Sequence, residues 1–122
     1  MDTHLTKFRL PWPPSLNRYY RTWKGRVLIA EDGRKYRKTV GKLAMVNRFG
    51  NFGNKRIKVE VEALPPDRRR RDLDNLYKGV LDSLQHAGVY DDDGQIDDLH
   101  IRRGDIEKGG LLIVKIQSLE CL

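Results

Sequence analysis

The sequence predicts a small single-domain α+β fold with a mixed β-sheet and two main helices. The chain has 122 residues, which suits one domain with one hydrophobic core. Residues 56–64 alternate apolar and charged side chains as a strand does, and residues 31–48 and 73–87 repeat apolar side chains at helical spacing. Strands and helices follow one another without repeats, so we expect a single domain over residues 1–122.

Short strands are expected around these segments. "KFRL" at 7–10 alternates well enough for a strand, and "YRTWKGRVLIA" at 20–30 predicts a hairpin that turns at Lys24–Gly25. "IDDLHIRRGDI" and "LLIVKIQSL" predict two more strands, joined as a hairpin by "EKGG". "LPWPPSLNRYY" at 10–20 contains three prolines, which excludes a helix there and favours an extended turn.

The two helices differ in how clearly the sequence defines them. The apolar residues of 31–48 fall on or near one side, at Tyr36, Val40, Leu43, Ala44 and Val46. From Leu73 onward, apolar residues cover one face about 140° wide, and Gly88 ends the helix. The opposite, polar face carries the following residues: Asp74, Asn75, Lys78, Asp82, Gln85 and His86.

Charge is the most informative bulk property. The net charge is +7 and the pI about 9.7, which favours a polyanionic partner, either nucleic acid or an anionic membrane surface. "GRKYRKTVGKLAMV" only loosely resembles a membrane-binding amphipathic helix, and no apolar run is long enough to span a bilayer.

The N-terminus lacks the apolar stretch of a signal peptide, so the cytoplasm is the expected location. Cys121 is the one cysteine, which excludes an internal disulfide and a cysteine-based zinc cluster.

The segment "DRRRRDLDN" at 67–75 places four arginines directly before two aspartates. Asp72 precedes the helix, Asp74 lies in its first turn, and Lys78 follows on the same polar face. A second acidic cluster, Asp91 to Asp93, follows the helix, which is about 20 Å long. The two acidic groups meet only if the later loop folds back, or if a neighbouring strand or a second subunit supplies the proximity.

Structural explanations exist for each of these residues. An aspartate before a helix can cap it, an acid in the first turn favours the helix dipole, and Lys78 can pair with Asp74. The aspartate run and the arginine run can be a solvated turn and a solvated loop.

Taken together, these residues favour metal-dependent phosphodiester hydrolysis. Three aspartates without a histidine or cysteine cluster suit a hard cation, preferably Mg²⁺. A metal-bound water attacks phosphodiesters, and Lys78 can balance developing negative charge. Arg69, Arg70 and Arg71 suit phosphate oxygens, and Asn17 and Arg18 are further candidates for DNA contact.

Three stretches resemble the RusA family of Holliday-junction resolvases, the crossover junction endodeoxyribonucleases: "LPWPPSLNRYYR", "PDRRRRDLDNLYKGVLDSLQHAG" and "DDDGQIDDLHIRR…EKGG". The resemblance implies a homodimeric α+β endonuclease of bacteria and prophages that acts in recombination and repair. It implies symmetric cuts in four-way DNA junctions with Mg²⁺, or Mn²⁺ as a substitute.

The family's catalytic and metal-binding acids correspond to Asp72, Asp74 and Asp93, and its catalytic lysine to Lys78. The extra acid, Asp91, leaves Asp92 as an alternative to Asp93. Two alternatives to a resolvase remain: a DNA- or junction-binding protein of this fold that has lost cleavage, and a basic structural protein.

Overall fold

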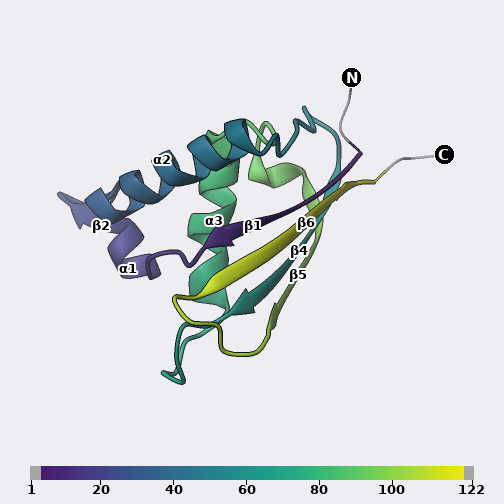
Figure 1. Cartoon of the computed structure of the whole chain (residues 1–122). Helices are drawn as coiled ribbons and strands as arrows, with labels where there is room; N and C mark the ends of the chain where they lie inside the picture. The colour runs from purple at the N-terminus through teal and green to yellow at the C-terminus, as the bar shows by residue number, and fades with distance from the viewer. Residues whose placement is uncertain (1–3, 120–122) are drawn as a thin grey trace.

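A computed structural model describes residues 4–119 (Figure 1). The elements, in chain order, are β1 (Leu5–Pro11), α1 (Leu16–Tyr19), β2 (Tyr20–Trp23), β3 (Arg26–Ile29), α2 (Glu31–Val46), β4 (Ile57–Leu64), α3 (Asp74–His86), the 3₁₀ helix η1 (Asp93–Gln95), β5 (Ile96–Arg103) and β6 (Leu111–Ser118). Cys121 lies outside the described residues. Within residues 4–119, no helix has both the length and the apolar character to cross a membrane.

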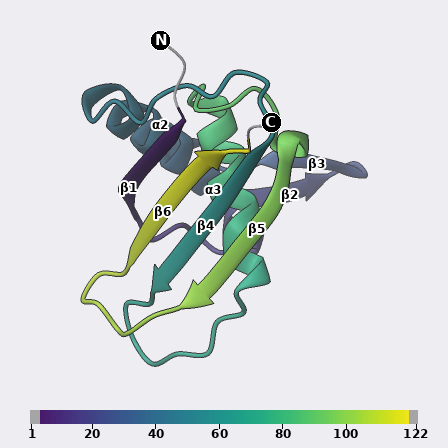
Figure 2. The ribbon, with the colours of Figure 1, turned by 90° about the vertical axis from the view of Figure 1, so that its right-hand side faces the viewer.

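The main sheet has four strands in the order β1-β6-β4-β5. β6 is antiparallel to both of its neighbours, whereas β5 is parallel to β4. The mixed sheet is therefore confirmed, but the predicted hairpin between 96–106 and 111–119 is wrong, because β4 separates β5 from β6 (Figure 2). β4, α3 and β5 instead form a strand–helix–strand unit, whose two strands run parallel.

The second sheet is the predicted hairpin of β2 and β3. Lys24 and Gly25 both have positive φ, at 48° and 72°, as a two-residue turn requires when it must match strand twist. The prediction that residues 10–20 contain no helix is wrong for the C-terminal part of this segment, where α1 forms a single turn. This turn begins after Pro14, so no proline lies inside it, and the Tyr19 N–H donates to the Ser15 carbonyl.

The two main helices are confirmed. Tyr36 and Val40 of α2 are buried, but Val46, at its end, is 77% exposed and does not belong to the apolar face. α3 buries Leu76, Val80 and other apolar residues of the predicted stripe. Gly88 follows it with φ of 82°, the left-handed conformation that ends a helix.

The core lies between one face of the sheet and the helices, which Figure 2 shows behind the strands. Alternate residues of β4 and β6, such as Val59, Val61 and Val114, point into it. The other face is charged and carries cross-strand ion pairs such as Lys115–Glu60. α1 and the hairpin lie on the side of α3 away from the sheet (Figure 1), so α3 is packed from both sides.

Candidate functional site

Three of the predicted catalytic residues stand exposed at the N-terminal half of α3. The side chains of Asp72, Asp74 and Lys78 have no hydrogen bond or ion pair with any residue in the described part of the chain. Leu73 occupies the N-cap position and no side chain caps this helix, so Asp72 is not a cap. Capping and an Asp74–Lys78 ion pair therefore do not explain these residues, and their charges are available to a ligand.

The acidic loop after α3 is held by a buried glutamine, Gln95. Its side-chain oxygen accepts the N–H groups of Asp91 and Asp92 at 3.1 and 3.0 Å. Its amide nitrogen donates to the carbonyl of Gly53 at 2.9 Å. Because Gln95 is only 5% exposed, these bonds fix the loop against the body of the protein.

The same loop bends back onto the C-terminal end of α3, and this does not bring it to the aspartates at the N-terminal end. The Asp93 N–H donates to the side-chain oxygen of Gln85 at 2.9 Å. Asp93 lines a cleft of about 550 Å³ between the β2–β3 hairpin and α3, together with Lys78 and Asp82. Asp92 does not line this cleft, which favours Asp93 over Asp92 as the functional acid.

The surroundings of Asp93 disfavour its charged form. Partial burial, the neighbouring carboxylate of Asp92 and, more weakly, Asp82 raise the pKa of Asp93 above its ordinary value. A cation bound beside Asp93 would offset this repulsion.

A single chain does not gather the three aspartates. Asp93 lies near Asp82 and Gln85, which follow Asp74 by eight and eleven residues, or roughly 12 to 16 Å along the helix. Oxygen ligands of one Mg²⁺ each lie about 2.1 Å from the ion. Consistent with this separation, residues 4–119 contain no group of three or more His, Cys, Asp or Glu side chains placed so that they could hold one metal ion.

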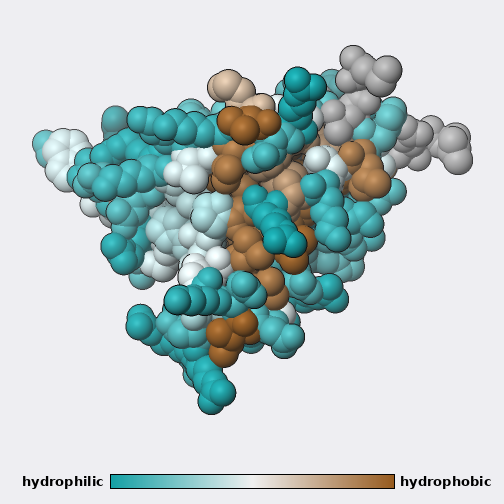
Figure 3. Space-filling view, in the orientation of Figure 1, coloured by the Kyte–Doolittle hydropathy of each residue, from teal (hydrophilic) through white to brown (hydrophobic). Residues whose placement is uncertain are grey.

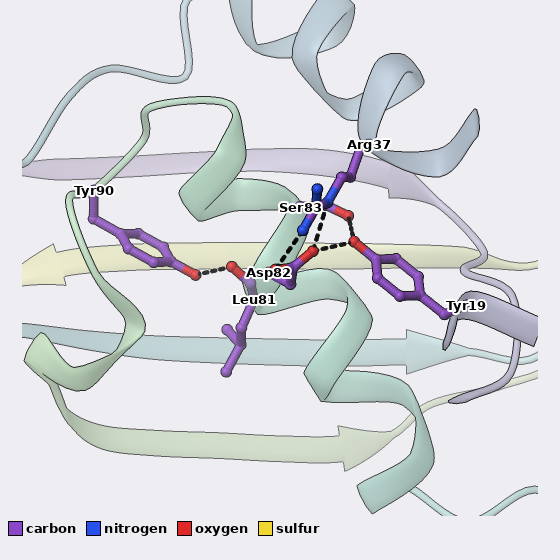
Figure 4. A network of polar contacts seen from close by, with 6 residues as sticks. All are labelled: Tyr19, Arg37, Leu81, Asp82, Ser83 and Tyr90. Carbon is purple, nitrogen blue, oxygen red and sulfur yellow. Dashed lines mark hydrogen bonds and ion pairs between the residues drawn. The ribbon is translucent and has the colours of Figure 1, made fainter. Parts of the chain in front are cut away.

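Asp82 has a role that its place on the polar face of the helix did not reveal. Its carboxylate accepts two bonds from Arg37 of α2, at 2.8 and 2.9 Å, and one from the Tyr19 hydroxyl (Figure 4). Tyr19 also bonds to the hydroxyl of Ser83 at 2.8 Å. Burial acts to raise the pKa of Asp82, but the bonds from Arg37 and Tyr19 outweigh it and lower that pKa. Asp82 therefore joins α1, α2 and α3.

The arginine run forms an ordered loop before α3. Asp67 accepts hydrogen bonds from the Arg69 N–H at 2.8 Å and from the Arg71 guanidinium at 2.7 Å. These bonds, that of Arg71 first and that of Arg69 second, lower the pKa of Asp67 to about 2. Arg71 also lies over the ring of Trp12, 5.7 Å from its centroid. Arg70 is exposed without a partner in residues 4–119, so the loop holds Arg71 and leaves Arg70 available.

The other candidate DNA contacts lie on α1. Asn17 is exposed and lines the cleft that contains Lys78 and Asp93. Arg18 forms an ion pair with Asp32 at 2.9 Å and also borders a hollow beside Arg70. Both residues thus stand next to the predicted catalytic groups, and their contact with DNA stays a prediction.

Comparison with known proteins gives a consistent result. Residues 11–117 match the family described as endodeoxyribonuclease RusA. A crossover junction endodeoxyribonuclease of Enterobacteria phage HK97 is 46% identical over 114 residues, covering 93% of this chain and 95% of that protein. The enzyme of the same name from Enterobacteria phage 82 is 40% identical over 116 residues, which cover 95% of this chain and 94% of that protein. The one from Escherichia coli K12 is 41% identical over 111 residues, which cover 90% of this chain and 92% of that protein. The chain therefore belongs to the RusA family of endodeoxyribonucleases.

Proposed function

We propose that this protein resolves four-way DNA junctions by symmetric, Mg²⁺-dependent hydrolysis of two phosphodiester bonds, as a homodimer. The observation that carries the proposal is the set of exposed, unpaired groups Asp72, Asp74 and Lys78 beside the arginine loop, in a chain of this family. Its relatives come from phages and Escherichia coli, which supports a role in a bacterial or prophage setting.

The residues of the site fit a divalent cation of the Mg²⁺ class. Carboxylates are the ligands that this class prefers, and Asp72 and Asp74 are exposed and uncommitted. When bound, Mg²⁺ supplies a Lewis acid for the scissile phosphate, a role in which Mn²⁺ is a suitable substitute. Lys78 would stabilise negative charge on the phosphate oxygens, and the arginine loop would hold the DNA backbone.

A second copy of the chain would complete each site. Asp74, Lys78 and Asp82 lie four residues apart along one stripe of α3, and Asp93 lies at the far end of that stripe. If two stripes pack around a two-fold axis that runs perpendicular to the helices, each N-terminal end faces the other chain's C-terminal end. Asp93 of the partner subunit would then approach Asp72 and Asp74, and two equivalent sites would result, as two symmetric cuts require.

The proposal is tested by cleavage of labelled DNA. A synthetic four-way junction and a linear duplex of the same sequence are each incubated with the protein in Mg²⁺ or in EDTA. We expect paired, symmetric cuts only in the junction and only with Mg²⁺. Binding of the junction without cleavage would identify a binding protein that has lost catalysis, and equal cutting of the duplex would remove the selectivity for junctions.

A further inference from the structure

The positive charge of the protein is concentrated in one part of the fold. Residues 17–48, here called the arm, comprise most of α1, the β2–β3 hairpin, α2 and the two residues after α2. The arm contains ten Lys and Arg residues and two acidic residues, which gives it a net charge of +8. The rest of the chain contains fourteen Lys and Arg residues and fifteen acidic residues, which gives it a net charge of −1. The arginine run at 68–71 is thus offset by acids elsewhere, and the arm accounts for the basic character of the chain.

The acids of the arm are already neutralised within it. Asp32 pairs with Arg18 at 2.9 Å, and Glu31 pairs with Lys35 at 3.3 Å. Most of the remaining cations are exposed, and within residues 4–119 only Arg37 of these has an ion pair, to Asp82. The arm therefore presents cations without counter-ions to solvent.

On α2 these cations form a row. Arg34, Lys38 and Lys42 follow one another at four-residue spacing, on the side of the helix opposite the buried Tyr36 and Val40. The row spans roughly 12 Å of the helix, a length along which a DNA duplex carries several phosphates. Figure 3 shows a mostly hydrophilic surface over this part of the molecule, beside a hydrophobic band.

The hairpin extends this basic surface. Arg21, Trp23 and Arg26 share one face of the ribbon, because Arg26 lies opposite Trp23 and Arg21 is two residues before it. Trp23 is 54% exposed. Thr22 and Val27 of the opposite face line the cleft that holds Lys78 and Asp93, and Arg21 also borders this cleft. The cations of the arm therefore begin at the edge of the candidate site and continue away from it.

The arm is fixed to the body of the protein rather than free to move. Arg37 and the Tyr19 hydroxyl are both bound to Asp82 of α3, and the Tyr36 hydroxyl donates to the Pro11 carbonyl at 2.8 Å. A fixed backbone holds the spacing of the cations, so that only their side chains have to become ordered on binding.

We infer that the arm is a second DNA-contact surface, which binds backbone phosphates of a duplex arm of the junction through Arg34, Lys38, Lys42, Arg21 and Arg26. This inference rests on the proposed function, because the junction supplies the duplex. The arginine loop then binds DNA near the cleaved bond, while the arm binds DNA that leads away from it.

The test compares two double variants that remove equal charge. Lys38→Gln with Lys42→Gln changes the arm, and Lys7→Gln with Arg9→Gln changes exposed residues of β1, outside the arm and the candidate site. Glutamine preserves helix propensity, and melting temperature and circular dichroism verify folding. Junction affinity is measured in EDTA from about 50 to 200 mM salt, so that the result does not depend on cleavage.

We expect the arm variant to bind the junction more weakly at low salt and the slope of log K against log salt to fall by about 2, at roughly 0.9 per lost phosphate contact. The β1 variant should keep the wild-type slope. Equal loss in both variants would overturn the inference, because net charge alone would explain binding, and so would an unchanged slope in the arm variant. A wild type that binds but does not cut junctions in Mg²⁺ would refute the proposed activity alone.

Discussion

Two aspartates eight residues apart on α3, Asp74 and Asp82, differ in what surrounds them. Asp74 is exposed and has no polar partner in residues 4–119, whereas Asp82 accepts bonds from Arg37 and Tyr19. A carboxylate without partners contributes little to stability, while one that neutralises a half-buried guanidinium contributes more. The same residue type on one stripe of one helix is therefore committed to packing at Asp82 and is left without a partner among the described residues at Asp74, where the proposed metal site needs it.

Replacing Asp74 with Asn should abolish cleavage and preserve the fold. A neutral amide is a poorer ligand for Mg²⁺, so single-turnover cleavage should fall by orders of magnitude. Junction affinity in EDTA should hold or rise, because a negative charge that faces phosphates is lost. Melting temperature should stay within the range of a surface substitution. Cleavage within about threefold of the wild-type rate would contradict the metal-ligand role.

Replacing Asp82 with Asn should have the opposite result, a loss of stability. Arg37 would lose its counter-ion, and a single amide oxygen would replace the two carboxylate oxygens that Arg37 and Tyr19 share, which costs about 1 to 3 kcal/mol of unfolding free energy. Chemical denaturation at neutral pH measures this loss, and Asp74→Asn is the matched control. An Asp82→Asn protein as stable as the wild type would show that the network contributes nothing.

The effect of Asp82 should also depend on pH. The folded-state pKa of Asp82 is lowered, so its contribution is fully present above the unfolded pKa, near 4, and disappears as pH falls through the lower folded value. The difference in unfolding free energy between wild type and Asp82→Asn should therefore be constant from about pH 5 upward and shrink below pH 4.

At the scale of elements, the arm depends on how closely α1 approaches α2. A Cβ atom at Gly33 of α2 would lie 2.3 Å from the Tyr19 carbonyl oxygen, whereas one at Gly41 of the same helix would meet nothing within 4 Å. Alanine favours a helix over glycine by about 1 kcal/mol at both positions. Comparing substitutions at the two glycines therefore separates the effect of close packing on stability from the effect of helix propensity.

Gly33→Ala should destabilise the protein by about 1 to 3 kcal/mol, because the backbone of α1 must move away. Gly41→Ala should be neutral or stabilising by up to about 1 kcal/mol. Thermal unfolding of both variants checks this pair. If both substitutions stabilise the protein, the close contact between α1 and α2 is absent in solution.

The arginine loop gives a second prediction at this scale. Arg69→Ala and Arg70→Ala should each weaken junction binding and lower its salt slope by about one unit or less. Arg71→Ala should do the same and also disturb the loop, because Arg71 contacts Asp67 and Trp12. Salt titration of junction affinity in EDTA, with Arg9→Ala as control, measures these slopes. Unchanged slopes in all three variants would mean that the loop is only a solvated turn.

At the scale of the whole molecule, local patterns predicted the elements but not their order in the sheet. Periodicity located α2, α3 and β4, because each buries one regular face. The order β1-β6-β4-β5 was missed because "EKGG" at 107–110 has the composition of a hairpin turn. Two signals favoured the observed order: the strand–helix–strand sequence, which predicts a parallel pair, and the charges along β5, which suit an edge strand.

The candidate site was predicted in its residues but not in its geometry. Residue type and spacing single out the acidic clusters and Lys78, and the family resemblance assigns Asp72, Asp74 and Asp93 among them; their catalytic role stays a prediction. The distance between Asp74 and Asp93 could not be predicted, because it depends on where the loop after α3 is fixed. The bonds of Gln95 and Gln85 place Asp93 at the far end of α3, and sequence spacing contains no signal for them.

Under the proposed function this separation would require two chains for each site, and we expect a homodimer mass by light scattering at micromolar concentration. The most direct test mixes two inactive proteins, Asp74→Asn and Asp93→Asn, with different affinity tags that verify heterodimer formation. In a shared site, one of the two sites of the heterodimer carries both substitutions and the other carries neither.

The measurement is single-turnover cleavage of a four-way junction in Mg²⁺. Each variant alone should be inactive, and the mixture should regain cutting at one strand, because one intact site is restored. A mixture that forms heterodimers but stays as inactive as its components would contradict the account, since each site would then be built within a single chain.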